Sequence, residues 1–120
     1  MNEDPADEVL DSLDDLVQVM EECHALLTAV RARASAIRDQ RSSGATYNDI
    51  VKDAPEPLLV QIVTANLLKV ERAGHRFRRA EVLALRAEGL STRQIAKLLH
   101  ISHERVSVLG RDAIQESPLS

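Results

Sequence analysis

The helix ends near the C-terminus constrain the fold of this 120-residue chain more than any other feature. Apolar residues recur at helical spacing over residues 76–88, and Gly89 then suits the left-handed position that closes a helix. Two further helical patterns follow, over residues 92–99 and 103–114. Each is preceded by a serine whose hydroxyl can accept a hydrogen bond from an unpaired backbone N–H. These predicted N-caps are Ser91 and Ser102.

The last two helices are spaced as in a helix-turn-helix. Two short helices joined by a few residues can cross steeply only where the first carries a small residue, and Ala96 lies at that position. Ile101 would fill the corner. The second helix of such a pair fits the major groove of B-DNA, so exposed side chains of residues 103–114 could reach base edges. The predicted base-reading residues are Arg105 and Glu104, with His103, Ser107 and Val108 as additional contacts.

Phosphate contacts are expected from the basic half of the chain. Residues 1–68 carry a net charge of −8 and residues 69–112 carry +5, although the whole chain has −4. Positive side chains supply most nucleic-acid affinity, but an arginine-rich helix can also be a solvated face or pair with acidic residues of the N-terminus. The predicted phosphate-binding residues are Arg76, Arg78, Arg79, Thr92, Arg93, Lys97, Ser102 and Arg111.

Two family resemblances involve this stretch. The chain resembles LuxR-type DNA-binding domains at Glu81-Val82-Leu83, Gly89-Leu90-Ser91, Gln94-Ile95-Ala96, Leu99, Ile101-Ser102 and Val106. It also resembles region 4 of bacterial sigma factors, in which a Glu-Arg pair contacts promoter bases, at Ser102-His103-Glu104-Arg105-Val106. Both resemblances imply a helix-turn-helix domain of a small bacterial transcriptional regulator. The same apolar skeleton also occurs in helix-turn-helix units that bind protein.

The N-terminal third predicts one long amphipathic helix. From Val9 onward apolar residues recur at alternating steps of four and three, which is typical of a coiled-coil seam. Such a helix is longer than one helix-turn-helix unit can cover, so we expect a homodimer, with antiparallel helices preferred because they set acidic residues beside arginines. The alternative is that the helix folds back over its own domain, and the two arrangements can coexist. The predicted dimer interface is Val9, Leu13, Leu16, Met20, Cys23, Leu27 and Val30.

The middle of the chain matches the C-terminal unit at an offset of 45 residues. Residues 41–52 align with residues 86–97, so that the glycine and the cap residue coincide. This repeat predicts a second helix-turn-helix-like unit, with helices over 47–53 and 58–73, the latter ending at Gly74. Because residues 58–73 are apolar nearly all round, they should be buried in a bundle or at a subunit interface. We interpret this unit as architectural, with a tandem DNA reader as the alternative.

The predicted fold class is therefore all-α. Aromatic residues are almost absent and no strand pattern competes with the helical ones. The expected organisation is an acidic lead-in and heptad-patterned dimerisation helix over 1–41, a degenerate packing unit over 42–74, a helix-turn-helix unit over 75–115 and a disordered tail over 116–120. The first eight residues are expected to fray.

Other chemistry is set aside. Cys23 lies on the apolar seam, where a buried structural thiol is expected, and His100 and His103 lack a second ligand pair. We expect no catalysis, metal or cofactor. The longest apolar run, 58–68, is too short to span a membrane, and a single cysteine suits a reducing compartment. The expected protein is cytoplasmic, associated with the nucleoid and bound to double-stranded DNA, with RNA polymerase or another regulator as a further partner.

The alternative function belongs to another class. In it the chain is a protein-interaction adaptor, similar to a sigma or anti-sigma factor. Its acidic helix and its arginine-rich face would then bind protein partners. The uneven charge distribution supports both hypotheses.

Overall fold

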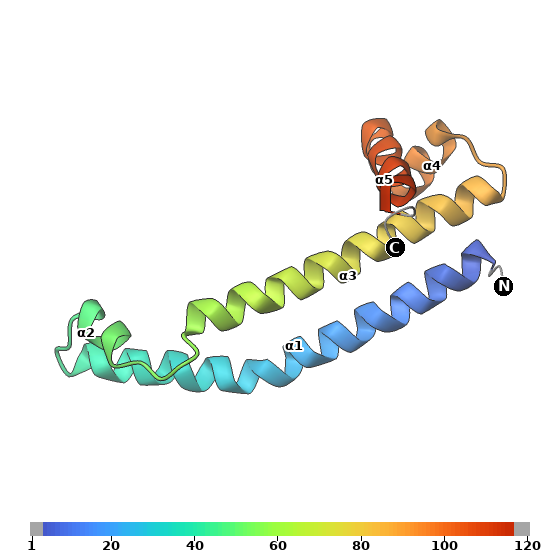
Figure 1. Ribbon diagram of the computed structural model, residues 1–120. Coiled ribbons are helices and arrows are strands. Elements are labelled where there is room, and N and C mark those ends of the chain that lie inside the picture. The colour runs from blue at the N-terminus through green and yellow to red at the C-terminus, as the bar shows by residue number, and fades with distance from the viewer. Residues whose placement is uncertain (1–3, 117–120) are drawn as a thin grey trace. The chain divides into compact units, whose positions relative to one another are not determined.

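A computed structural model describes residues 4–116 and confirms the all-α class, because these residues form helices and no strand. The helices are α1 Pro5–Ser42, α2 Tyr47–Lys52, α3 Leu59–Ala87, α4 Thr92–Leu99 and α5 His103–Glu116 (Figure 1). The chain divides into two compact units. We call Gln18–Glu71 the central unit, and the described residues before and after it the terminal unit. Helices α1 and α3 contribute to both.

The long helix α1 begins earlier than predicted. Pro5 lies at its first position, where the missing N–H of proline removes no helical hydrogen bond. Asp4 precedes it, and its carboxylate accepts a hydrogen bond of 2.9 Å from the backbone N–H of Ala6. The predicted fraying of the first eight residues is therefore wrong from Pro5 onward. The residues before Asp4 lie outside the described part, as does the predicted tail after Glu116, which itself belongs to α5.

Helix α3 runs without interruption through Gly74, so the predicted helix end at this residue is wrong. A glycine inside a helix costs only about 1 kcal/mol relative to alanine, and packing of the residues around it can outweigh that cost. Ala73 is buried directly before Gly74, and Ala80 is buried about two turns after Ala73. The helices predicted over 58–73 and 76–88 are thus one helix of 29 residues.

In the terminal unit, the start of α1 lies beside the end of α3 (Figure 1). Ser12 of α1 is completely buried, and its hydroxyl donates a 2.7 Å hydrogen bond to the carbonyl of Val9. Ala73, Ala80 and Ala84 of α3 are also buried, and Ala84 lines a cavity together with Ala6 and Val9 of α1. Small side chains on both helices allow a close approach of the two backbones.

In the central unit, the second part of α1 lies beside the start of α3, and α2 connects them (Figure 1). Thr46 caps α2 as predicted, because its hydroxyl accepts a 3.1 Å hydrogen bond from the N–H of Asp49. Three contacts join α1 to the start of α3 and the loop before it. They are Cys23 Sγ to Asn66 Oδ1 at 3.8 Å, Lys69 Nζ to Glu22 Oε1 at 3.6 Å, and Arg33 Nη1 to the carbonyl of Pro57 at 2.9 Å.

The apolar seam of α1 is used largely within the chain. Five of its seven predicted interface residues are half-buried in the single chain: Val9, Leu13, Leu16, Cys23 and Val30. Met20 and Leu27 are exposed. The helix therefore folds back over its own chain, which was the alternative interpretation of the pattern, and only part of the seam remains for a second copy. Within residues 4–116, no helix combines the length and apolarity that a membrane span requires.

Candidate nucleic-acid interface

The corner between α3 and α4 is fixed by backbone geometry. Gly89 has a φ of 95°, and its N–H donates to the carbonyl of Arg86 at 2.9 Å. The N–H of Leu90 donates to the carbonyl of Leu85 at 3.1 Å, which completes the hydrogen-bond pair of a Schellman motif. A side chain at residue 89 would be strained at this φ, so the glycine allows α3 to end here.

Helix α4 begins with a complete capping box. The hydroxyl of Ser91 accepts from the N–H of Gln94 at 3.2 Å, and the side-chain oxygen of Gln94 accepts from the N–H of Ser91 at 2.8 Å. Two backbone donors that the helix itself cannot satisfy are thereby paired. The predicted cap at Ser91 is confirmed, and the start of α4 is fixed.

The turn from α4 to α5 is built on His100. This residue has a φ of 58°, a left-handed conformation that histidine tolerates better than most side chains do. The N–H of His100 and that of Ile101 both donate to the carbonyl of Ala96, the latter at 3.1 Å. The hydroxyl of Ser102 then accepts from the N–H of Arg105 at 3.0 Å and caps α5 as predicted.

A small aliphatic core holds α5 against α3 and α4. Val82, Ile95, Val106 and Leu109 have no exposed surface, and Ala96 is buried among them. Ile101 is half-buried against this cluster, as expected for a residue that fills the corner. The core supports α5 from one side and leaves its opposite side to solvent.

The exposed side of α5 carries three of the predicted base-reading residues in its first turn. His103, Glu104 and Arg105 are all exposed, directly before the buried Val106. Ser107 and Val108 are half-buried, so less of each side chain is available to a ligand. Recognition helices contact base edges chiefly through their N-terminal residues, which favours the first three positions.

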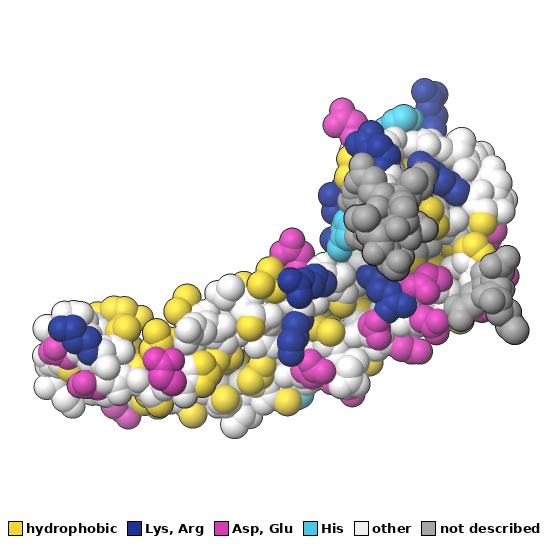
Figure 2. All heavy atoms as spheres, viewed as in Figure 1, with side chains coloured by type: hydrophobic (Ala, Val, Ile, Leu, Met, Phe, Trp, Pro, Cys, Tyr) yellow, Lys and Arg dark blue, Asp and Glu magenta, His cyan; other side chains and the backbone are white. Residues whose placement is uncertain are grey.

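The predicted phosphate-binding residues fall into two groups. Arg78, Arg93, Lys97 and Arg111 are exposed on the terminal unit. Thr92 and Arg79 are half-buried, Arg79 takes part in an interaction within the chain, and the hydroxyl of Ser102 is occupied as a cap. Figure 2 shows lysine and arginine side chains around α4 and α5. The terminal unit thus presents basic side chains near the exposed residues of α5.

Arg76 departs from the prediction. Its Nε and Nη2 lie 3.0 and 2.7 Å from Glu8 Oε1, and its Nη1 pairs with the carboxylate of Asp15. Both acids belong to the start of α1, so this guanidinium is directed to the protein itself and its charge is balanced there. Pairing with the acidic N-terminus was the alternative interpretation of this arginine, and the structure shows this pairing in place of the predicted phosphate contact.

Two features of this unit were not predicted: the approach of Arg86 to the backbone at Gly110, and the cavity beside Glu81. Gly110 is buried in α5, where an added Cβ would lie 2.8 Å from Cζ of Arg86, so the guanidinium of Arg86 crosses the helix backbone at this point. Glu81 lines a cavity with apolar residues of α1 and α4, among them Val9 and Leu98. Burial raises the pKa of the Glu81 carboxyl. The sequence signal for the approach of Arg86 was a glycine inside a helical pattern. No sequence signal indicated the cavity beside Glu81.

The geometry agrees with a family comparison of the chain. The match to the homeodomain-like domain family covers residues 76–109, from the second half of α3 to the middle of α5. These residues form a homeodomain-like helix-turn-helix domain. No curated protein and no solved structure matches the chain. The finer resemblances to LuxR-type regulators and to sigma region 4 stay predictions.

Proposed function

We propose that the chain is a sequence-specific regulator of transcription that binds double-stranded DNA through its homeodomain-like domain. The observation that carries the proposal is the first turn of α5, where His103, Glu104 and Arg105 are exposed on a helix fixed by a fully buried core. A helix held in this way can enter the major groove without first becoming ordered, so little entropy is lost on binding.

Arg105 is the residue on which specificity would chiefly depend. A guanidinium can donate two hydrogen bonds to O6 and N7 of guanine, and a carboxylate such as that of Glu104 can accept from N4 of cytosine. Each good bidentate contact contributes about 1–3 kcal/mol of discrimination against the wrong base. Arg78, Arg93, Lys97 and Arg111 would hold the phosphates, which accounts for affinity and not for sequence preference.

The test measures duplex binding over a range of salt concentrations, first with a random pool and then with duplexes selected from it. Arg105→Ala should weaken binding to the selected site by about 1–3 kcal/mol and flatten the preference at one base position. Arg105→Lys is the matched control, because it keeps the charge and loses the planar pair of donors. It should retain the salt dependence of the wild type but not the base preference. Absence of duplex binding at low salt would rule out the proposal.

A second candidate function is favoured by the ion pairs of Arg76. Glu8 and Asp15 show that the acidic start of α1 can neutralise a basic side chain of the terminal unit. In a protein-interaction adaptor, the same acidic residues would contact a basic partner. The double variant Glu8→Gln, Asp15→Asn separates the two functions. If the chain binds DNA, the double variant should bind duplexes more tightly than the wild type, because Arg76 is no longer paired with Glu8 and Asp15. If the chain is an adaptor, neither the wild type nor the double variant should bind duplexes.

A further inference from the structure

The central unit buries too little apolar surface to be complete in one chain. Ile50, which is 4 % exposed, is the one buried apolar side chain among its residues, all of which the structure describes. Other large apolar side chains of the unit lie in solvent, for example Val60 at 66 % and Leu67 at 63 % exposed. Two helices alone seldom bury enough surface for stability, and helical proteins usually bury such stripes against further helices.

The exposed apolar residues form one face. On α3 they are Val60, Val63 and Leu67, at steps of three and four, and on α1 they are Met20 and Leu27, seven residues apart. On each helix, each of these residues comes one position after a residue that is turned toward the neighbouring helix. Both stripes are therefore rotated away from the helix contact in the same sense. In an antiparallel pair of helices, these two stripes therefore open on the same side. Figure 2 shows apolar side chains gathered along the central unit in the view drawn.

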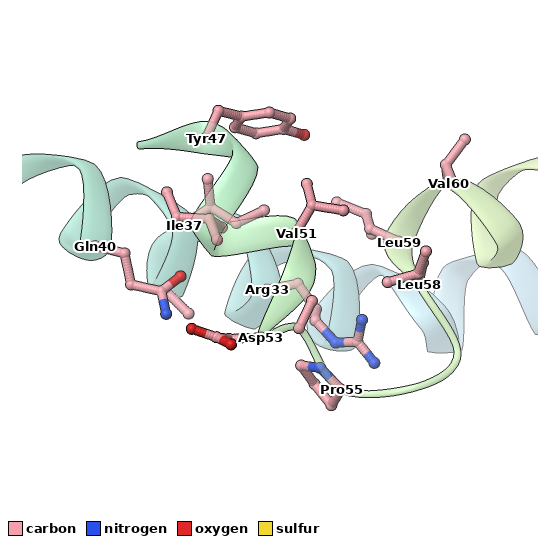
Figure 3. A pocket seen from close by; sticks show the side chains of 13 residues that line it. Arg33, Ile37, Gln40, Tyr47, Val51, Asp53, Pro55, Leu58, Leu59 and Val60 are labelled. Carbon is pink, nitrogen blue, oxygen red and sulfur yellow. The ribbon is translucent and has the colours of Figure 1, made fainter. Parts of the chain in front are cut away.

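This face continues to the cavity beside α2. The cavity measures about 170 Å³ and lies between α1, α2 and the start of α3. Figure 3 shows Tyr47, Val51 and Val60 on one side of it. All three are exposed, so the cavity opens where the apolar face ends. A partner helix that covers the face would also cover this opening.

We propose that the face defined by Met20, Leu27, Val60, Val63 and Leu67 pairs with the same face of a second copy, in an antiparallel four-helix bundle. These five residues are 41–66 % exposed. On the order of 450 Å² of apolar surface per copy, or about 900 Å² in a symmetric pair before its polar rim is counted, lies near the lower end of specific interfaces. The proposed interface therefore differs from the predicted one. It lies on one side of α1 and α3 together, and not along the seam of α1 alone.

The charges of α1 make the face self-complementary. Glu21 lies beside the first part of the stripe, whereas Arg31 and Arg38 lie beside its continuation, and all three side chains are exposed. In an antiparallel arrangement, Glu21 of one copy approaches Arg31 of the other. A parallel arrangement would set like charges together. A second copy is therefore complementary to this surface in charge. On the proposed function, such a pair would also bring two DNA-binding domains to one site.

Sedimentation of the full-length chain over a concentration series tests the pairing. The wild type should approach twice the mass of one chain. Leu67→Glu should shift the midpoint of association at least about tenfold to higher concentration, because a carboxylate would enter an apolar interface. Leu98→Glu is the control, because Leu98 is similarly exposed at 56 % but lies on α4 in the terminal unit. Its midpoint should not change.

Three results would overturn the proposal, and none depends on DNA. A wild-type chain that remains at single mass excludes a second copy as the occupant. An unchanged midpoint for both Leu67→Glu and Val60→Glu, each with wild-type helical circular dichroism, excludes this face. For the orientation, Glu21→Arg alone should weaken association and mixing it with Arg31→Glu should restore it, because the two helices then carry opposite charges at each contact. An unaltered midpoint for Glu21→Arg alone excludes the antiparallel arrangement.

Discussion

The corners at Gly44 and Gly89 share the same pattern of backbone hydrogen bonds, but the helices that follow them are packed differently. At Gly44 the φ is 96°, and the N–H groups of Gly44 and Ala45 donate to the carbonyls of Arg41 and Gln40. The corner at Gly89 has the corresponding pair of hydrogen bonds at the same offset of 45 residues. A capped helix follows each. The repeat seen in the sequence is therefore a repeat of hydrogen bonds.

The two corners diverge at the residue after the buried isoleucine. Ala96 follows Ile95 and is covered by α5, whereas Val51 follows Ile50 and is 40 % exposed. After α4 the left-handed His100 turns the chain into α5. After α2 the chain instead passes through Pro55 and Pro57, which cannot donate backbone hydrogen bonds to such a turn. The corner motif therefore sets the geometry of two helices, while the next turn decides whether a third helix completes the core.

Truncating the two isoleucines should give the largest contrast between the units. Ile95→Ala removes a side chain with no exposed surface from a closed cluster and should lower the free energy of unfolding by about 2–5 kcal/mol. Ile50→Ala should cost less, because the exposed residues around it can rearrange into the space. Urea unfolding followed by circular dichroism measures both values. Equal losses would show that the central unit has a closed core after all.

Enlarging the crossing residue should give a smaller contrast. Ala96→Val places two methyl groups where α5 crosses α4, and overpacking of this kind costs about 1–3 kcal/mol. It should also weaken duplex binding, because α5 must move. Val51→Ala, the opposite change at the equivalent position, should alter stability little in the single chain, since no helix covers that residue. The same denaturation measurement checks both, and a neutral Ala96→Val would contradict the tight crossing.

The sequence predicted local geometry better than it predicted packing. Gly89, Ser91 and Ser102 were identified correctly because caps and left-handed turns depend on a few neighbouring residues. Gly74 was misassigned as a helix end, because the packing of the adjacent Ala73 comes from residues distant in sequence. The same reason applies to Arg76, whose acidic partners Glu8 and Asp15 lie more than sixty residues away. The apolar seam of α1 indicated a partner helix, but periodicity alone could not identify it as α3.

The smallest expected effect concerns Glu81, which shows how far the core of the terminal unit extends. Burial raises the pKa of this carboxyl, so the folded state favours its protonated form. The contribution of Glu81 to stability is therefore present below the ordinary glutamate pKa and is lost as the pH rises through the raised value. Glu81→Gln, which cannot ionise, should raise Tm slightly at neutral pH, and the gain should vanish as the pH falls below the ordinary glutamate pKa.

Glu88→Gln is the matched control for this last prediction. Glu88 lines the same cavity but is exposed, so its carboxylate loses less hydration on folding. Thermal unfolding of both variants at several pH values distinguishes burial from a general effect of removing one negative charge. If the two variants gain the same stability at neutral pH, relief of repulsion among the acidic residues would explain the gain, and burial of Glu81 would not. A gain confined to Glu81→Gln would show that the apolar core of the terminal unit extends to the cavity between α1 and α4.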